Sequence, residues 1–279
     1  MSGISFGLMA VLARRASRQP GSFTAGHLSV VRFAVGALAS LVLFRLRPGT
    51  YRPHNGRLLV ARGVSGGLVV VLYFFALARI PAGQAGLLYN LFPVIATLMS
   101  IFALGERPTV HLLLGLTLAT AGVALVLGGD GLRVRPGLGT LSALGAAVFA
   151  AASANVMRAM RGTENAPTIF FFFCLVGLPV VLPFALAPWP AAPAVWGLGL
   201  LVGLAAFAAQ LLMADAYGDL SVSEAAAWLQ VTPVAQVLLA WPLLDEQPTA
   251  TGLAGVVLAA VGVGIATVLG RRVPRARSS

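Results

Sequence analysis

Two segments of the chain, NLFPVIATLMSIFALGERPT at residues 90–109 and QVTPVAQVLLAWPLLDEQPT at residues 230–249, follow one pattern. They align without a gap at a constant offset of 140 residues, and seven of the twenty positions are identical. The shared positions include a proline within the apolar run and a glutamate in the turn that follows it, Pro93 with Pro233 and Glu106 with Glu246. A segment that recurs half a chain apart indicates one fold made of two similar halves.

The composition indicates that most side chains face lipid. Of the 279 residues, 58% are hydrophobic and only 10% are charged, and the mean hydropathy is +0.91. A soluble protein of this size usually has about 25% charged residues. This chain has too few to cover a soluble surface, and its 32 glycines suit helices that pack closely in a bilayer. We therefore expect an all-α integral membrane protein.

Apolar runs long enough to cross a bilayer, about 17–25 residues each, predict nine spanning helices. They lie at residues 26–46, 58–78, 82–104, 110–128, 138–157, 168–187, 194–216, 222–244 and 250–270. A tenth, N-terminal run is short, ends at Ala13, and has no basic segment before it, so we expect no signal peptide. Compared with 138–157 it lacks residues at its start. It is either a half-length helix or the product of a start codon placed too late, and the second explanation is favoured.

Ten helices in two halves give five helices per half. Because five is odd, the second half must enter the membrane from the opposite side, which gives an inverted-topology repeat, a signature of secondary transporters. We expect one five-helix repeat over residues 1–130, a second over 137–270, and a basic cytoplasmic tail over 271–279.

All nineteen basic residues are arginine. The absence of lysine excludes a P-loop ATPase, because that loop needs its lysine on the phosphates. The net charge of +11 would suit nucleic acid, but the arginines fall between apolar runs, so we expect no nucleic-acid partner. With the N-terminus in the cytoplasm, twelve arginines, Arg62 among them, fall in inside segments and six fall outside. This bias predicts a multi-pass protein of the cytoplasmic (inner) cell membrane with both termini in the cytoplasm.

The stretch ALARIPAGQAGLLYNLFPVIATLMSIFALGERPT, residues 76–109, is followed by GLTLATAGVALVLGG, residues 115–129. Together they resemble the EamA family of the drug/metabolite transporter superfamily. The resemblance extends over nearly the whole chain, with DEQPT in the second half where the first has GERPT. It implies ten helices in two five-helix repeats and the movement of small metabolites across the cytoplasmic membrane. The family includes exporters of amino acids and other metabolites.

Pro93 and Pro233 fall near the centres of spans 82–104 and 222–244. A proline removes a backbone donor and displaces the carbonyl four residues earlier, here those of Tyr89 and Leu229. Freed carbonyls at membrane depth are tolerated where protein or a water-filled cavity satisfies them. We predict a hinge or cavity at both prolines; the alternative is a kink that only improves packing.

Asn90 and Gln230 each lie three residues before these prolines. We predict that they bind substrate from symmetric positions, although such amides also commonly bond a neighbouring helix. The remaining substrate-binding candidates are aromatic or central polar residues, which could equally serve packing: Tyr73, Tyr89, Asn155, Gln210 and Trp228.

Three ionisable side chains within the predicted spans are candidates for a structural or a functional role. Glu224 lies in SVSE, where Ser221 and Glu224 predict a capping box at a helix start. Asp215, near the end of its span, is a better ionisable candidate. Arg32 lies about six residues into its span, where it could snorkel to water or serve function.

These features predict a secondary transporter that exports a small organic metabolite, such as an amino acid, by alternating access. The alternative is an integral-membrane enzyme acting on a lipid or lipid-linked substrate, which would need convergent reactive groups at one membrane face. Glu106 and Glu246 fall on opposite faces in an inverted topology, and the three histidines are scattered. We therefore expect no catalytic residues, metal or cofactor. The expected partners are the solute and the lipid bilayer. The coupling ion, with a proton as one candidate, and the oligomeric state stay open.

Overall fold

The computed structural model describes residues 1–17, 23–77, 79–80, 82–128, 137–245 and 249–269. Within these ranges all regular structure is helical, as the composition predicts. The helices of the first half are α1 (Ser2–Ser17), α2 (Ala25–Leu46), α3 (Gly56–Leu77), α4 (Ala82–Tyr89), α5 (Phe92–Ala103) and α6 (Val110–Gly128). Those of the second half are α7 (Leu138–Met160), α8 (Ala166–Val181), η1 (Leu182–Ala185), α9 (Pro193–Asp219), α10 (Val222–Leu229), α11 (Val231–Leu244), α12 (Ala250–Gly264) and the π-helical turn η2 (Ile265–Leu269).

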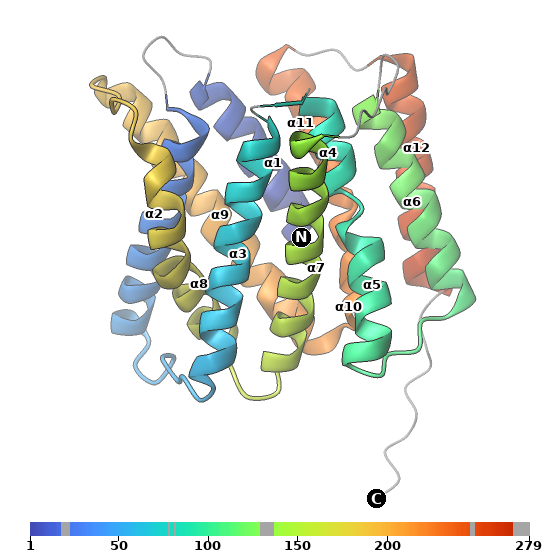
Figure 1. Cartoon of the computed structure of the whole chain (residues 1–279), viewed down its shortest axis with the longest axis horizontal. Helices are drawn as coiled ribbons and strands as arrows, with labels where there is room; N and C mark the ends of the chain where they lie inside the picture. Colours follow the sequence, from blue (N-terminus) through green and yellow to red (C-terminus); the bar gives the residue numbers. More distant parts are fainter. Residues whose placement is uncertain (18–22, 78, 81, 129–136, 246–248, 270–279) are drawn as a thin grey trace, which may run out of the picture.

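Length and composition make much of this bundle suitable for a bilayer. Seven segments within the described residues are long and apolar enough to cross a membrane, and shorter apolar helices lie at Ser2–Ala13, Phe92–Ala103 and Val110–Val126. The helices stand side by side with their connections at the two ends (Figure 1). Large apolar side chains on their outer faces are exposed, Leu38 and Val42 of α2 among them. Such a surface is stable in lipid, and the protein is therefore a multi-pass membrane protein.

Two of the expected spans are not single helices. The run 82–104 is divided into α4 and α5 at Asn90 and Leu91, and the run 222–244 is divided into α10 and α11 at Gln230. In both, the proline follows the break, with Pro93 in the first turn of α5 and Pro233 at the third residue of α11. A proline fits the first turn of a helix, where its missing N–H has no intrahelical partner. The repeated sequence therefore encodes the same interruption twice.

Close helix contacts depend on glycine. In α6 and α12, a Cβ added at Gly122 would lie 2.6 Å from the carbonyl oxygen of Gly255, and one at Gly255 would lie 2.6 Å from that of Gly122. The same reciprocal relationship joins Gly115 and Gly262. Because the residue numbers rise along one helix as they fall along the other, α6 and α12 are antiparallel, and their backbones touch through these glycines.

The N-terminal helix is longer than its apolar run predicts, and a predicted helix cap is confirmed. α1 extends to Ser17, beyond Ala13, where the apolar run stops. The arginines after Ala13 do not end the helix, since arginine is a good helix former. At the start of α10, the Ser221 side chain accepts from the Glu224 N–H and the Glu224 carboxylate accepts from the Ser221 N–H. The predicted capping box is therefore confirmed.

Candidate substrate site in the helix bundle

Arg62 of α3 is buried at the centre of the site, with 4% of its surface exposed. Its Nη1 donates to Ser153 Oγ of α7 at 2.8 Å, and its Nη2 donates to Gln210 Oε1 of α9 at 3.4 Å. Its guanidinium carbon lies 4.2 Å from the ring centroid of Phe173 in α8. Its Nε is buried without a hydrogen-bond partner. One charged side chain thus joins four helices.

This position corrects the assignment of Arg62 to a cytoplasmic segment. The side chain points into the bundle because its neighbours leave room for it. A Cβ added at Gly66, one turn further along α3, would lie 2.9 Å from Arg62 Nη1 and would also contact the ring of Phe173. Glycine at 66 therefore makes the space that the guanidinium and the ring share.

Arg32 of α2 provides a second cation facing the same region. Its guanidinium carbon lies 5.1 Å from the ring centroid of Phe33. The charge lies within electrostatic range of Tyr89, Cys174 and Arg62. Arg32 is half-buried, and its side chain has no hydrogen bond within the described residues. The Arg32 guanidinium therefore faces the interior of the helix bundle, beside the buried Phe33, and does not only snorkel toward a water layer.

Tyr89 and Phe92, on either side of the break in the first half, form an aromatic group with Tyr73 of α3. The ring centroids of Tyr73 and Tyr89 are 5.1 Å apart, and those of Tyr89 and Phe92 are 5.4 Å apart. Tyr89 is the last residue of α4 and lies within electrostatic range of both Arg32 and Arg62. Of the predicted site residues, Gln210 thus bonds to Arg62, Tyr89 lies within electrostatic range of both arginines, and Tyr73 packs against Tyr89.

The two amides at the helix breaks have different partners. Asn90 Nδ2 donates to the carbonyl of Gly86 in α4 at 2.8 Å, one turn back in the chain. Gln230 is fully buried; its Nε2 donates to Thr120 Oγ1 of α6 at 2.8 Å, while its Oε1 has no partner. The predicted substrate contacts of both amides stay predictions, as does the hinge role of Pro93 and Pro233.

Asn155 of α7 also bonds to backbone. Its Nδ2 donates to the carbonyls of Ala96 at 3.1 Å and Ala151 at 2.9 Å, and its Oδ1 is buried without a partner. The bond to Ala96 ties α7 to α5, just beyond the first break. A substrate-binding role for Asn155 stays a prediction, with the orphan oxygen as the group available for it.

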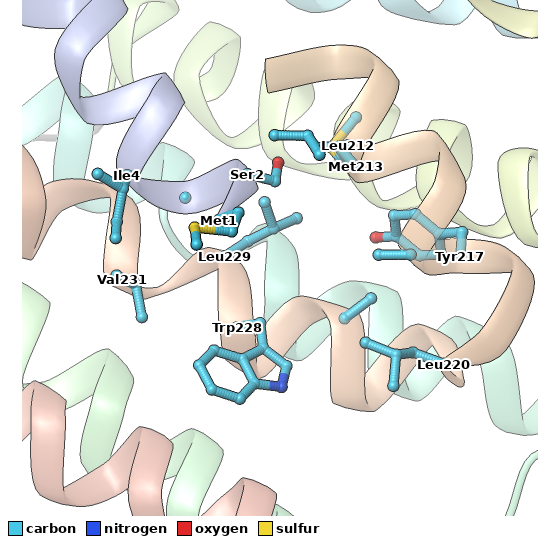
Figure 2. Close-up of a pocket in the computed structure, with 13 residues that line it drawn as sticks. Met1, Ser2, Ile4, Leu212, Met213, Tyr217, Leu220, Trp228, Leu229 and Val231 are labelled. Carbon is cyan, nitrogen blue, oxygen red and sulfur yellow. The ribbon is translucent and has the colours of Figure 1, made fainter. Parts of the chain in front are cut away.

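A cavity of about 320 Å³ lies between α1, α9, α10 and the start of α11 (Figure 2). Its walls are mostly apolar, and Figure 2 shows Trp228 and Tyr217 on its lower and right-hand sides. Trp228 is 43% exposed, whereas Tyr217 is fully buried and its hydroxyl has no hydrogen-bond partner. Tyr217 lies within electrostatic range of Arg62. Arg62 itself does not line the cavity, and Tyr217 is the lining residue that its charge influences.

The acidic candidate Asp215 lies away from this region. Its side chain is 73% exposed, and its carboxylate pairs with Arg161 Nη2 at 3.3 Å. Asp215 follows Gln210 on α9 by more than one helical turn, which places it at the outer end of the helix. Among the described residues no group of three or more His, Cys, Asp or Glu is placed to hold a metal ion.

Apolar helices interrupted in their middle, beside buried polar side chains, are typical of membrane transport proteins. The chain belongs to the EamA-like transporter family, whose profile matches residues 1–128 and 137–268. This membership confirms the resemblance seen in the sequence and identifies the chain as a membrane transport protein.

Two kinds of relative are named as exporters. The chain is 28% identical over 266 residues to the pseudopaline exporter CntI of Pseudomonas aeruginosa, in strains UCBPP-PA14 and PAO1, covering 94% of this chain and 91% of that protein. It is 30% identical over 212 residues to a "probable terminal-alkyne amino-acid exporter" of Streptantibioticus cattleyicolor, covering 72% and 70%. Family and relatives point to a transporter rather than an enzyme.

Solved structures include a crystal structure with the same fold. It superposes with a TM-score of 0.79 at 22% sequence identity and covers 98% of each chain. At this identity the likeness concerns the fold alone.

Proposed function

We propose that the protein is a secondary transporter that exports a small, amino-acid-like metabolite across the cytoplasmic membrane. It works by alternating access, in which two inverted five-helix repeats, residues 1–130 and 137–270, move against each other. The observation that carries the proposal is the repeated interruption, at Asn90 and Leu91 in one half and at Gln230 in the other. Transporters bind solute at discontinuous helices related by such a repeat.

The packing supports a two-fold relationship between the halves. A Cβ added at Gly63 of α3 would contact Val176 of α8, and one at Gly203 of α9 would contact Val35 of α2. Gly63 and Gly203 are 140 residues apart, the offset of the sequence repeat. The antiparallel seam of α6 and α12 is reciprocal in the same way. The contact of α3 with α8 therefore has its counterpart in the contact of α9 with α2, as a two-fold relationship between the halves requires.

The solute is proposed to bind where the broken helices approach the bundle interior. Gln210 bonds to Arg62, and Tyr89 lies within electrostatic range of it. Tyr73 packs against Tyr89, and Trp228 borders the cavity. Asn90, Asn155 and Gln230 complete the proposed lining, with Pro93 and Pro233 as hinges. An amino-acid-like solute is supported by the names of the exporter relatives.

Both termini are proposed to be cytoplasmic. The buried Arg62 no longer counts as an inside residue, which leaves 12 − 1 = 11 inside arginines against six outside. The bias keeps its sign, so the positive-inside argument still applies.

Counterflow in proteoliposomes tests the function. Purified protein is reconstituted, loaded with one unlabelled amino acid or amino-acid derivative at a time, and diluted into a trace of the same labelled compound. A carrier gives saturable, transient accumulation of label for at least one compound, and protein-free liposomes give none. Chemical conversion of a solute or lipid, or no counterflow with any compound of the panel, would contradict the proposal.

A further inference from the structure

We propose that Arg32 and Arg62 form a binding site for carboxylate, so that the transported solute is an organic acid with at least one carboxylate and, best, two. The inference deepens the proposed transport function and rests on it. It names the chemical class that the central site accepts.

The first step is the charge. Arg62 is buried and Arg32 is half-buried, and the two lie within electrostatic range of each other. Removing such cations from water is costly unless an opposite charge is present, and like charges add repulsion. The ion pairs found among the described residues join His54 to Glu164 and Arg161 to Asp215, so neither central arginine has a carboxylate partner there.

Three acidic side chains among the described residues accept hydrogen bonds from backbone N–H groups. Glu106 accepts from the Val222 N–H, Glu164 accepts from the His54 and Asn55 N–H groups, and Glu224 caps its own helix. These carboxylates lie at helix starts. Among the described residues none of these carboxylates bonds to Arg32 or Arg62, so a bound acid would supply the opposite charge that the two arginines lack.

The second step is the geometry of Arg62. Its Nη groups bond to a neutral hydroxyl and a neutral amide, and the bond to Gln210 is long, at 3.4 Å. Its Nε has no partner at all. The edge formed by Nε and one Nη is a donor pair that a carboxylate can accept in a bidentate manner, with charge assistance that the present partners lack.

The third step is the set of donors nearby. Arg32 has no hydrogen bond within the described residues, so its guanidinium can bind a second carboxylate. The phenol groups of Tyr89 and Tyr217 lie within electrostatic range of Arg62, and the Tyr217 hydroxyl is buried without a partner. Tyr217 also lines the cavity of Figure 2. An acid in this cavity would therefore reach Tyr217 first. Arginine forks and phenol donors together fit carboxylate oxygens.

The test compares each acid with its own amide. The probes are the common amino acids and N-carboxyalkyl amino acids, each paired with the compound in which every carboxylate is a primary amide. Binding is measured through thermal stabilisation of the detergent-purified protein, and transport through counterflow. We expect acids to stabilise the protein and to be carried, dicarboxylic acids more strongly, whereas the matched amides do neither.

Variants assign the effect to the pair. Arg62→Gln and Arg32→Gln should each weaken acid binding about tenfold or more, since a charged hydrogen bond is lost. Arg62→Lys keeps the charge without the fork and should fall between. The matched control is Arg79→Gln, two residues beyond the end of α3, because Arg79 is exposed and its guanidinium lies on the Phe75 ring. It should bind and transport as the parent does.

Folding is checked by gel filtration and by the melting temperature without ligand, and Arg32→Gln remains informative if Arg62→Gln does not fold. Equal binding of acids and amides, no acid binding by the parent protein, or unchanged acid binding in both glutamine variants would overturn the inference. If one of these results is found but the parent protein still shows counterflow of neutral solutes, the carboxylate inference fails and the transport function is retained. Acid binding without any counterflow would instead overturn the transport function.

Discussion

The carboxylate of Glu106 accepts the backbone N–H of Val222 through both oxygens, at 2.9 and 3.1 Å. Glu106 lies in the turn after α5, and Val222 is the first residue of α10. A glutamate of the first half therefore caps the broken helix of the second half. A negative charge at a helix start satisfies a free N–H and interacts favourably with the helix dipole. Its counterpart in the sequence repeat, Glu246, lies outside the described residues.

Removing this contact should destabilise the fold. We expect Glu106→Ala to lower stability by about 0.5–2 kcal/mol, the usual cost of losing a helix cap, and Glu106→Gln to lower it less because the amide oxygen still accepts. The melting temperature in detergent measures the effect. The control is Arg107→Ala, since Arg107 is the exposed neighbour. Identical melting temperatures for Glu106→Ala and Arg107→Ala would show that the contact contributes nothing.

The glycine seam of α6 and α12 allows a second prediction. Gly122→Ala and Gly255→Ala should each lower stability by about 1–3 kcal/mol, because overpacking forces the backbones apart. A Cβ at Gly264 has nothing within 4 Å, so Gly264→Ala on α12 is the matched control. That change should leave stability unchanged or raise it, since alanine favours helix. If Gly122→Ala or Gly255→Ala melts at the same temperature as Gly264→Ala, the close approach of α6 and α12 does not contribute to stability.

The features that could be predicted from the sequence are those determined by residues close together in the chain. Apolar length predicted the helices, the prolines predicted interruptions in 82–104 and 222–244, and the SVSE motif predicted the cap at Glu224. Each of these depends on residues close together in the chain, which pattern and propensity can read.

Arg62 was missed because its environment depends on distant residues. It lies six residues after the start of α3, near the arginines of the preceding loop, and a count of charges assigns it to that loop. Its partners Ser153 and Gln210 are 91 and 148 residues away in sequence. The available signal was an arginine four residues inside a predicted span, because a charge at membrane depth marks function by default.

Membrane orientation is tested by single cysteines in a Cys174→Ala background. Asn55 is exposed between α2 and α3, and Gly137 is exposed before α7. In intact cells we expect an impermeant thiol reagent to label Gly137→Cys and not Asn55→Cys, with Ser279→Cys in the tail also protected. Permeabilised cells are the control, in which all three should react. Labelling of Asn55→Cys and protection of Gly137→Cys in intact cells would reverse the assigned topology.

The last prediction separates substrate binding from helix packing at the two breaks. Gln230 is fully buried, bonds to Thr120, and keeps a free Oε1, so it can do both. Asn90 is half-buried, and among the hydrogen bonds described its side chain bonds only to Gly86, in the helix that ends just before it.

If both amides bind solute, Asn90→Leu should reduce counterflow several-fold with little change in melting temperature, because losing a hydrogen bond to solute costs about 0.5–1.5 kcal/mol. Gln230→Leu should reduce counterflow similarly and also lower the melting temperature. Thr120→Val removes only the packing bond, so it should lower the melting temperature while keeping transport per folded molecule. The double variant Gln230→Leu with Thr120→Val should then be no less stable than Gln230→Leu alone, since the two single changes remove one shared bond. Normal counterflow in Asn90→Leu and Gln230→Leu, with the stability losses unchanged, would show that both amides serve packing.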